Sequence, residues 1–138
     1  MNNLTKMKIN RPASEVFEAF VDPAKIGSFW FSSSSERWEA GKMVTLRYDE
    51  YYAEVVVKIT DIETNRKIVF EDEEGHTTTI TLKEENPSTT IIVVNEDGFD
   101  EKDVEGLIDN KEGWVYMLTC LKAYIECGIS TLRAALVK

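Results

Sequence analysis

The stretch that decides the fold is DNKEGWVYMLTCLKAYIECG, residues 109–128. Trp114, Leu118, Leu121 and Ile125 recur at i, i+4, i+7 and i+11, so they lie on one stripe of a helix. Three more apolar residues widen this stripe: Met117, Cys120 and Tyr124. A helix over residues 110–127 would be roughly 27 Å long. An apolar stripe of this size predicts that a broad second layer covers it.

Both ends of this helix carry sequence signals. Asp109 and Glu112 fit a capping box, in which two side chains bind free N–H groups at a helix start. Gly128 fits the left-handed position that follows a helix end. The pattern therefore predicts a helix that begins near residue 110 and ends at residue 127.

The N-terminal third predicts one strand and two short helices. Residues 4–10 alternate weakly and predict a strand. Pro12 suits a first helical turn, and a second helix start is predicted at Asp22-Pro23. An aromatic cluster follows it, and residues 32–35 are four serines that predict a loop. The serines lack the Gly-x-Ser-x-Gly elbow of a nucleophile, so no catalytic serine is expected there.

The middle of the chain predicts antiparallel strands joined by tight turns. Strands are expected over residues 37–39, 43–48, 51–61, 67–71, 76–83 and 89–94. Ala40-Gly41-Lys42 is expected to turn the first pair into a hairpin. The last strand has isoleucine and valine on both faces, which suggests that both are covered. A sheet with one apolar face can bury that face under the long helix, and its twist would curl it around the helix.

Composition limits the functional classes. The chain has 138 residues, 43% of them hydrophobic, which predicts one domain over residues 1–138. A net charge of −9 argues against nucleic acid and anionic lipid surfaces as partners. No apolar run is long enough for a membrane span, and no signal peptide is recognisable, so a cytoplasmic location with reduced cysteines is expected. His76 is the sole histidine and no Cys-x-x-Cys pair exists, so neither a metal site nor a cofactor is expected.

A series of motifs along nearly the whole chain resembles a known family. The motifs are Arg11 to Phe20 after a strand, Asp22-Pro23, Trp30, the Ala40-Gly41 hairpin, residues 67–70, and Gly113-Trp114 with Leu118, Leu121, Glu126 and Gly128. Together they resemble the START-like (SRPBCC, Bet v-like) superfamily, and more narrowly the bacterial homologues of the activator of the ninety-kilodalton heat-shock-protein ATPase. The resemblance implies an α+β helix-grip fold, with a curved antiparallel sheet of about six to seven strands around one C-terminal helix. It also implies a hydrophobic cavity between helix and sheet, as in lipid-binding members.

The first functional hypothesis is non-catalytic binding of a small apolar or aromatic molecule. Aromatic and methionine side chains are suited to the walls of an apolar pocket. The candidate cavity residues are Phe29, Trp30, Tyr48, Tyr51, Phe70, Trp114, Met117, Leu118 and Leu121. The alternative for each of them is ordinary core packing.

Two further hypotheses remain open. A cyclase or aromatase would need acids and bases in the cavity, and the candidates are Tyr48, Arg47, Glu54 and His76. Alternation places Arg47 and Glu54 outside, and His76 beside a hairpin turn is expected to be a solvated strand end. The third hypothesis is a chaperone partner or stress-response protein whose acidic stretches, residues 71–74 and 96–103, meet a basic surface. Residues 129–138 are a further short helix, a dimer contact or a tail, and the protein is a monomer or a homodimer.

Overall fold

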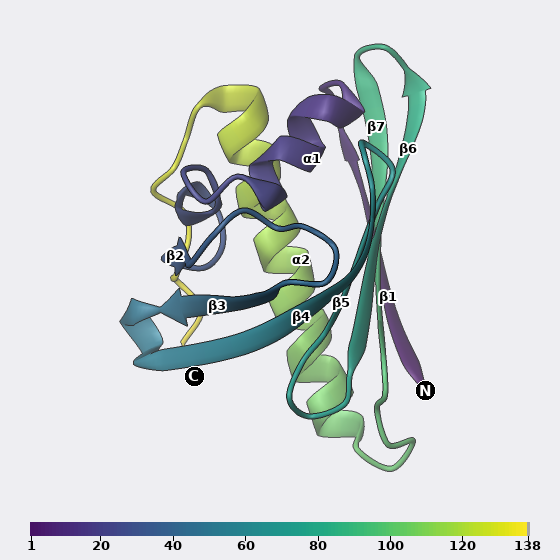
Figure 1. The fold of residues 1–138 in the computed structure, drawn as a ribbon, viewed down its shortest axis with the longest axis vertical. Helices are drawn as coiled ribbons and strands as arrows, with labels where there is room; N and C mark the ends of the chain where they lie inside the picture. The colour runs from purple at the N-terminus through teal and green to yellow at the C-terminus, as the bar shows by residue number, and fades with distance from the viewer. Residues whose placement is uncertain (138) are drawn as a thin grey trace.

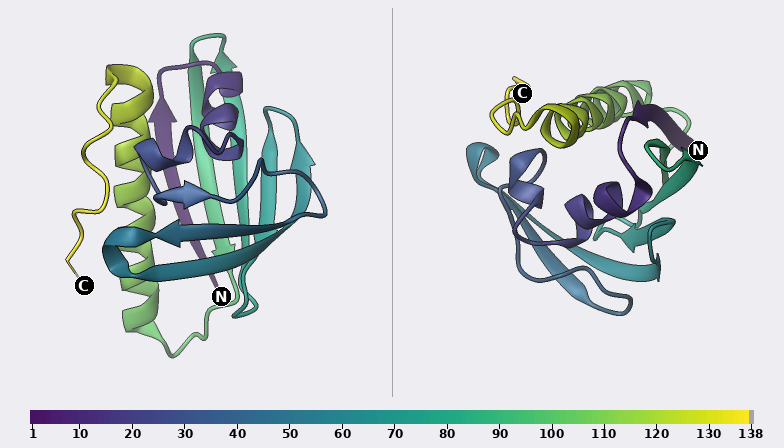
Figure 2. Two further views of the ribbon diagram at one scale, coloured as in Figure 1. Left: turned by 60° about the vertical axis from the view of Figure 1, so that its left-hand side comes forward. Right: turned by 90° about the horizontal axis from the view of Figure 1, so that it is seen from above.

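The computed structural model describes residues 1–137 and is built on one antiparallel sheet of seven strands (Figure 1). The strands are β1 (Asn2–Ile9), β2 (Ser33–Ser34), β3 (Met43–Tyr48), β4 (Ala53–Glu63), β5 (Lys67–Glu71), β6 (Thr77–Asn86) and β7 (Thr89–Asp97). Their order across the sheet is β1-β7-β6-β5-β4-β3-β2, so the first strand closes onto the last. The sheet curves, and the long helix α2 (Val104–Cys127) lies across its concave side (Figure 2). The predicted α+β helix-grip fold is confirmed.

Helix α2 begins six residues earlier than predicted, and the proposed capping box is wrong. The cap is Asp103, whose side chain accepts a hydrogen bond from the N–H of Gly106 at 3.0 Å. Two apolar residues of the first turns, Val104 and Ile108, are 58% and 65% exposed, so they lie off the buried stripe. Leu107 is half-buried, and its carbonyl accepts from Asn3 on β1. The buried part of the stripe therefore starts only at Trp114. The predicted C-terminus is confirmed, because Gly128 has φ +69° and donates its N–H to Tyr124.

The predicted stripe of α2 faces the interior. Its centre is buried, namely Trp114, Met117, Leu118, Cys120 and Leu121. Tyr124 and Ile125 are half-buried at the end of the helix and pack against the same core. Burial of this stripe against the inner side chains of the strands stabilises the fold, at about 25 cal/mol per Å² of apolar surface.

Of the two predicted short helices, one is a regular helix and one is a single turn. Helix α1 (Ala13–Val21) follows Pro12 as expected, and it buries Val16, Phe17 and Phe20. The second is the 3-10 turn η1 (Ile26–Ser28). Asp22 accepts from the N–H of Ala24 at 2.9 Å, which forms a tight turn instead of a helix start.

The predicted hairpin between residues 37–39 and β3 is wrong. Strand β3 pairs with β4 on one side. On the other side it pairs with β2, where Ser33 faces Arg47 and Ser34 faces Leu46, inside the serine run that predicted a loop. Trp38 does not join a strand, because its N–H donates to Val21 and its side chain is buried in the core. Strand β2 occupies the edge of β3 that β4 leaves unpaired. No local pattern in the serine run predicts this pairing.

Several strand bounds also differ from the prediction. Strand β4 begins at Ala53, because the preceding 3-10 turn η2 (Asp49–Tyr51) ends in the left-handed residue Tyr52. Strands β6 and β7 extend three residues beyond the expected ends, to Asn86 and Asp97. Strand β7 is fully buried on one face only, since the outward Ile91 and Val93 are half-buried.

Residues 129–137 form an extended segment that leaves α2 at Gly128 and runs back beside it (Figure 2). The alternative of a further short helix is therefore wrong for the described part. Lys138, the last residue of that predicted segment, lies outside the described residues. Over residues 1–137, no helix combines the length and the apolar character needed to cross a bilayer.

Candidate ligand pocket

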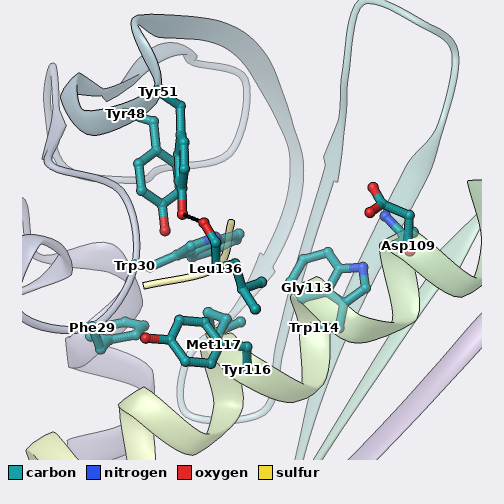
Figure 3. A pocket seen from close by; sticks show the side chains of 11 residues that line it. Phe29, Trp30, Tyr48, Tyr51, Asp109, Gly113, Trp114, Tyr116, Met117 and Leu136 are labelled. Atoms are coloured by element: carbon teal, nitrogen blue, oxygen red, sulfur yellow. Dashed lines mark hydrogen bonds between the residues drawn. The ribbon is translucent and has the colours of Figure 1, made fainter. Parts of the chain in front are cut away.

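A pocket of about 330 Å³ opens between α2, the segment after η1 and the β3–β4 connection (Figure 3). Most of its wall is aromatic or apolar, and two polar side chains lie on α2. The lining residues are Phe29, Trp30, Tyr48, Tyr51, Asp109, Asn110, Gly113, Trp114, Tyr116, Met117 and Leu136. Figure 3 shows Tyr48 and Tyr51 at one end and Asp109 at the other. The pocket therefore has a long apolar wall with polar groups at both ends, the tyrosine hydroxyls at one and Asp109 and Asn110 at the other.

The structure brings together six of the nine predicted cavity residues around this pocket. They are Phe29, Trp30, Tyr48, Tyr51, Trp114 and Met117. Phe70 instead borders a neighbouring hollow that shares Trp30 and Trp114 with the pocket. Leu118 and Leu121 are fully buried and belong to the core.

The aromatic walls support one another. The Trp30 ring lies 5.4 Å from Trp114, 4.7 Å from Phe31 and 6.5 Å from Phe70, measured between centroids. Tyr48 and Tyr51 meet edge to face at 4.7 Å. Such tilted contacts each contribute about 0.5–1.5 kcal/mol beyond burial. The wall is consequently a packed surface and not a set of independent side chains.

Sequence reasoning missed five lining residues. Four of them lie on α2: Asp109, Asn110, Gly113 and Tyr116. Asp109, Gly113 and Tyr116 follow helical spacing, so a correct helix start would have placed them on one face. Leu136 comes from the segment after α2, and its position depends on tertiary contacts alone.

A buried polar network lies directly behind Trp114. Glu96 on β7 is only 7% exposed, and one of its oxygens accepts from Trp114 Nε1 at 2.9 Å and Asn110 Nδ2 at 3.0 Å. Its other oxygen lies 2.6 Å from His76 Nδ1. Asn3 on β1 extends the network by donating to Asn110 at 3.0 Å. The hypothesis that the acidic stretch of residues 96–103 meets a basic surface therefore does not hold at Glu96, which follows Ile92 and Val94 on the inward face of β7.

His76 is also not the solvated strand end that was predicted. It is half-buried, and its hydrogen bond with Glu96 raises the pKa of the imidazole. Asp72, His76 and Glu96 place donor atoms within 4.8 Å of one another, so within residues 1–137 this group has the composition of a metal-binding cluster. The imidazole and Glu96 are bonded directly to each other, which satisfies both groups without an ion.

The remaining catalytic candidates do not converge on the pocket. Arg47 and Glu54 are exposed and pair with each other at 3.4 Å, as alternation predicted. Tyr48 lines the pocket, but burial raises the pKa of its phenol, so the hydroxyl stays protonated at neutral pH. A protonated phenol can donate a hydrogen bond to a ligand but cannot act as a base.

A curved antiparallel sheet wrapped around one C-terminal helix defines the helix-grip class of the START-like superfamily. Within this class, the chain belongs to the family described as Activator of Hsp90 ATPase homolog 1-like protein, which matches residues 10–126. This confirms the resemblance that the motifs indicated. No curated protein sequence matches the chain.

Solved structures with the same fold include one of high sequence identity. Protein SSP2350 from Staphylococcus saprophyticus is 51% identical, with a TM-score of 0.87, over 94% of this chain and 95% of that one. The Aha1 dimer from Colwellia psychrerythraea is 16% identical, with a TM-score of 0.83, over 93% of this chain and 98% of that one. CalU16 from Micromonospora echinospora is 18% identical, with a TM-score of 0.74, over 90% and 73%. The last two likenesses concern the fold alone.

Proposed function

We propose that the protein binds a small, uncharged aromatic or apolar molecule in the pocket beside α2, without catalysis. The observation that carries this proposal is the continuous aromatic wall of Phe29, Trp30, Tyr48 and Trp114 around an open space of about 330 Å³. Apolar walls with a few convergent polar groups are typical of small-molecule sites, and this volume suits a small ligand.

The polar groups suggest how a ligand would be oriented. Asn110 and Asp109 mark one end of the pocket on α2, and the tyrosine hydroxyls mark the other. A flat ligand with one hydrogen-bonding group would stack on the Trp30 and Trp114 rings and direct that group to one end. Of the four acid–base candidates only Tyr48 lies in the pocket wall, while Glu54 and His76 border the neighbouring hollow, which supports binding over acid–base chemistry in the pocket.

The other two hypotheses stay predictions. A cyclase-like reaction would need a base in the pocket, and the protonated Tyr48 does not provide one. A role beside a chaperone would rest on the family relationship and on exposed acidic residues such as Glu73 and Glu74. The pocket geometry favours neither of them.

Gly113 offers a direct test of the proposal. It lines the pocket, and a Cβ atom added at its Cα would meet nothing within 4 Å. Gly113→Leu would therefore fill the pocket, while the gain in helix propensity of about 1 kcal/mol supports folding. Val115→Leu is the matched control, because Val115 is 41% exposed and does not line the pocket.

The measurement is an NMR titration of isotope-labelled protein with fatty acids, sterols, flavonoids and aromatic polyketide mimics. The probe N-phenyl-1-naphthylamine is included, and the indole signals of Trp30 and Trp114 are followed. We expect saturable shifts in the wild type and in Val115→Leu, and affinity weakened by about tenfold or more in Gly113→Leu. Binding by none of the compounds, or equal affinity in all three proteins, would contradict the proposal.

A further inference from the structure

The segment of residues 129–137, here called the C-terminal strap, lies against the pocket. Its Leu136 side chain lines the space, and the Leu136 carbonyl accepts a hydrogen bond from the Tyr51 hydroxyl at 2.6 Å (Figure 3). The carbonyl of Leu132 accepts from the Tyr116 hydroxyl. Two residues of the pocket wall are thus bonded to the backbone of the strap.

Arg133 bonds the middle of the strap to three residues outside it, Trp30, Ser32 and Glu50. Its guanidinium donates to the Trp30 carbonyl at 2.7 Å, to Ser32 Oγ at 3.1 Å, and to both oxygens of Glu50 at 2.6 and 3.0 Å. It also lies 5.2 Å from the centre of the Tyr48 ring. The bidentate pairing lowers the pKa of Glu50 to about 2, so this ion pair persists over the physiological pH range.

Apart from this fastening, the strap buries little apolar surface. Ile129 and Leu132 are each 43% exposed, and Val137 is 94% exposed. Of the larger side chains, only Arg133, which is 12% exposed, and the half-buried Leu136 are well covered. A segment with so few buried side chains opens at a smaller free energy than the sheet and helix beside it. The strap can therefore detach while the rest of the fold remains intact.

We propose that the C-terminal strap is a gate for the pocket, and that the Arg133–Glu50 pair is its latch. A ligand enters and leaves when Arg133 releases Glu50 and Leu136 swings out of the pocket. The latch sets the rate of this exchange. This inference rests on the proposed function, because it concerns access to the same pocket.

Cys120 provides a readout of the gate that needs no ligand. Its side chain is 1% exposed and interacts with Tyr116, which is bonded to the strap. Burial also raises the pKa of the Cys120 thiol. The rate at which a thiol reagent modifies Cys120 should therefore report opening of the strap. Cys127 is exposed, so Cys127→Ser is used as the background.

The test compares Arg133→Gln, Glu50→Gln and a matched control in this background. The control is Arg47→Gln, since Arg47 pairs with Asp49 and Glu54 on the same surface but does not touch the strap. We expect Cys120 to be modified faster by about tenfold in Arg133→Gln. Glu50→Gln should give a smaller increase and Arg47→Gln none. Equal rates in all four proteins would overturn the gate, even if no ligand is found.

Stopped-flow fluorescence with N-phenyl-1-naphthylamine then tests the pocket. Association and dissociation should both be faster by about tenfold in Arg133→Gln, with a much smaller change in affinity. If the probe binds the wild type and Arg133→Gln with the same rates, the gate is wrong and the proposed function stands. If it binds neither protein while Cys120 still responds to Arg133→Gln, the strap opens as inferred and the proposed function fails.

Discussion

Two carboxylates lie on either side of the Trp30–Trp114 wall, and their surroundings differ. Glu96 is 7% exposed and is held by Trp114, Asn110 and His76. Glu50 has a side chain that is 43% exposed and is held mainly by Arg133. Both are well bonded, but only Glu96 has been removed from water. The number of hydrogen bonds therefore does not decide what each network does.

The physical difference is what happens when a partner is lost. A buried carboxylate or donor without a partner keeps its full desolvation cost, whereas an exposed one is solvated again. The Glu96 network should thus hold α2 on the sheet. The Glu50–Arg133 pair is suited to opening and closing the strap at small cost.

The largest loss of stability is expected when Trp114, which belongs to the pocket wall and binds Glu96, is replaced. Trp114→Ala removes a buried ring and leaves Glu96 without its Nε1 donor, so the free energy of unfolding should fall by about 3–5 kcal/mol. Val115→Ala, on the exposed side of α2, should change it by about 0.5 kcal/mol or less. Urea unfolding of the three proteins measures this. Similar losses in both variants would show that the interior side of α2 contributes no more to the free energy of unfolding than its outer side.

A smaller effect is expected from the ionisation of His76. Its hydrogen bond with Glu96 raises the pKa of the folded state above the ordinary value of 6.5. The stabilisation is therefore complete below pH 6.5 and is lost as the pH rises through the folded pKa. The free energy of unfolding should decline over this window in the wild type. Glu96→Gln should make this decline with pH less steep. An unchanged decline in that variant would show that Glu96 does not cause it.

The smallest effect on stability is expected at the latch. Arg133→Gln should lower the free energy of unfolding by only about 1 kcal/mol, because Glu50 is 43% exposed and the strap buries little apolar area, although the Arg133 side chain itself is 12% exposed. The same protein should show the faster Cys120 modification described above. A large loss of stability in Arg133→Gln would mean that the strap is part of the core, and the contrast between the two carboxylates would disappear.

Sequence reasoning does not predict most of the difference between the Glu96 network and the Glu50–Arg133 pair. The aromatic cluster at Phe29 and Trp30 and the stripe through Trp114 and Met117 indicated four of the residues that line the pocket. The sequence places Glu96 in the acidic stretch of residues 96–103, because the predicted strand ends at residue 94. Its phase with Ile92 and Val94 would have placed it inside, but the length of β7 was underestimated.

The sequence by itself determined the fold class. The long amphipathic stripe, the alternating strands and the glycine after residue 127 are local patterns, and each specifies an element through backbone geometry and burial. Tertiary structure decided the rest. The pairing of β2 with β3, the His76–Glu96 contact and the path of the strap join residues that are far apart in the chain. Such contacts leave no periodic trace, because they depend on which surfaces meet after the elements have formed.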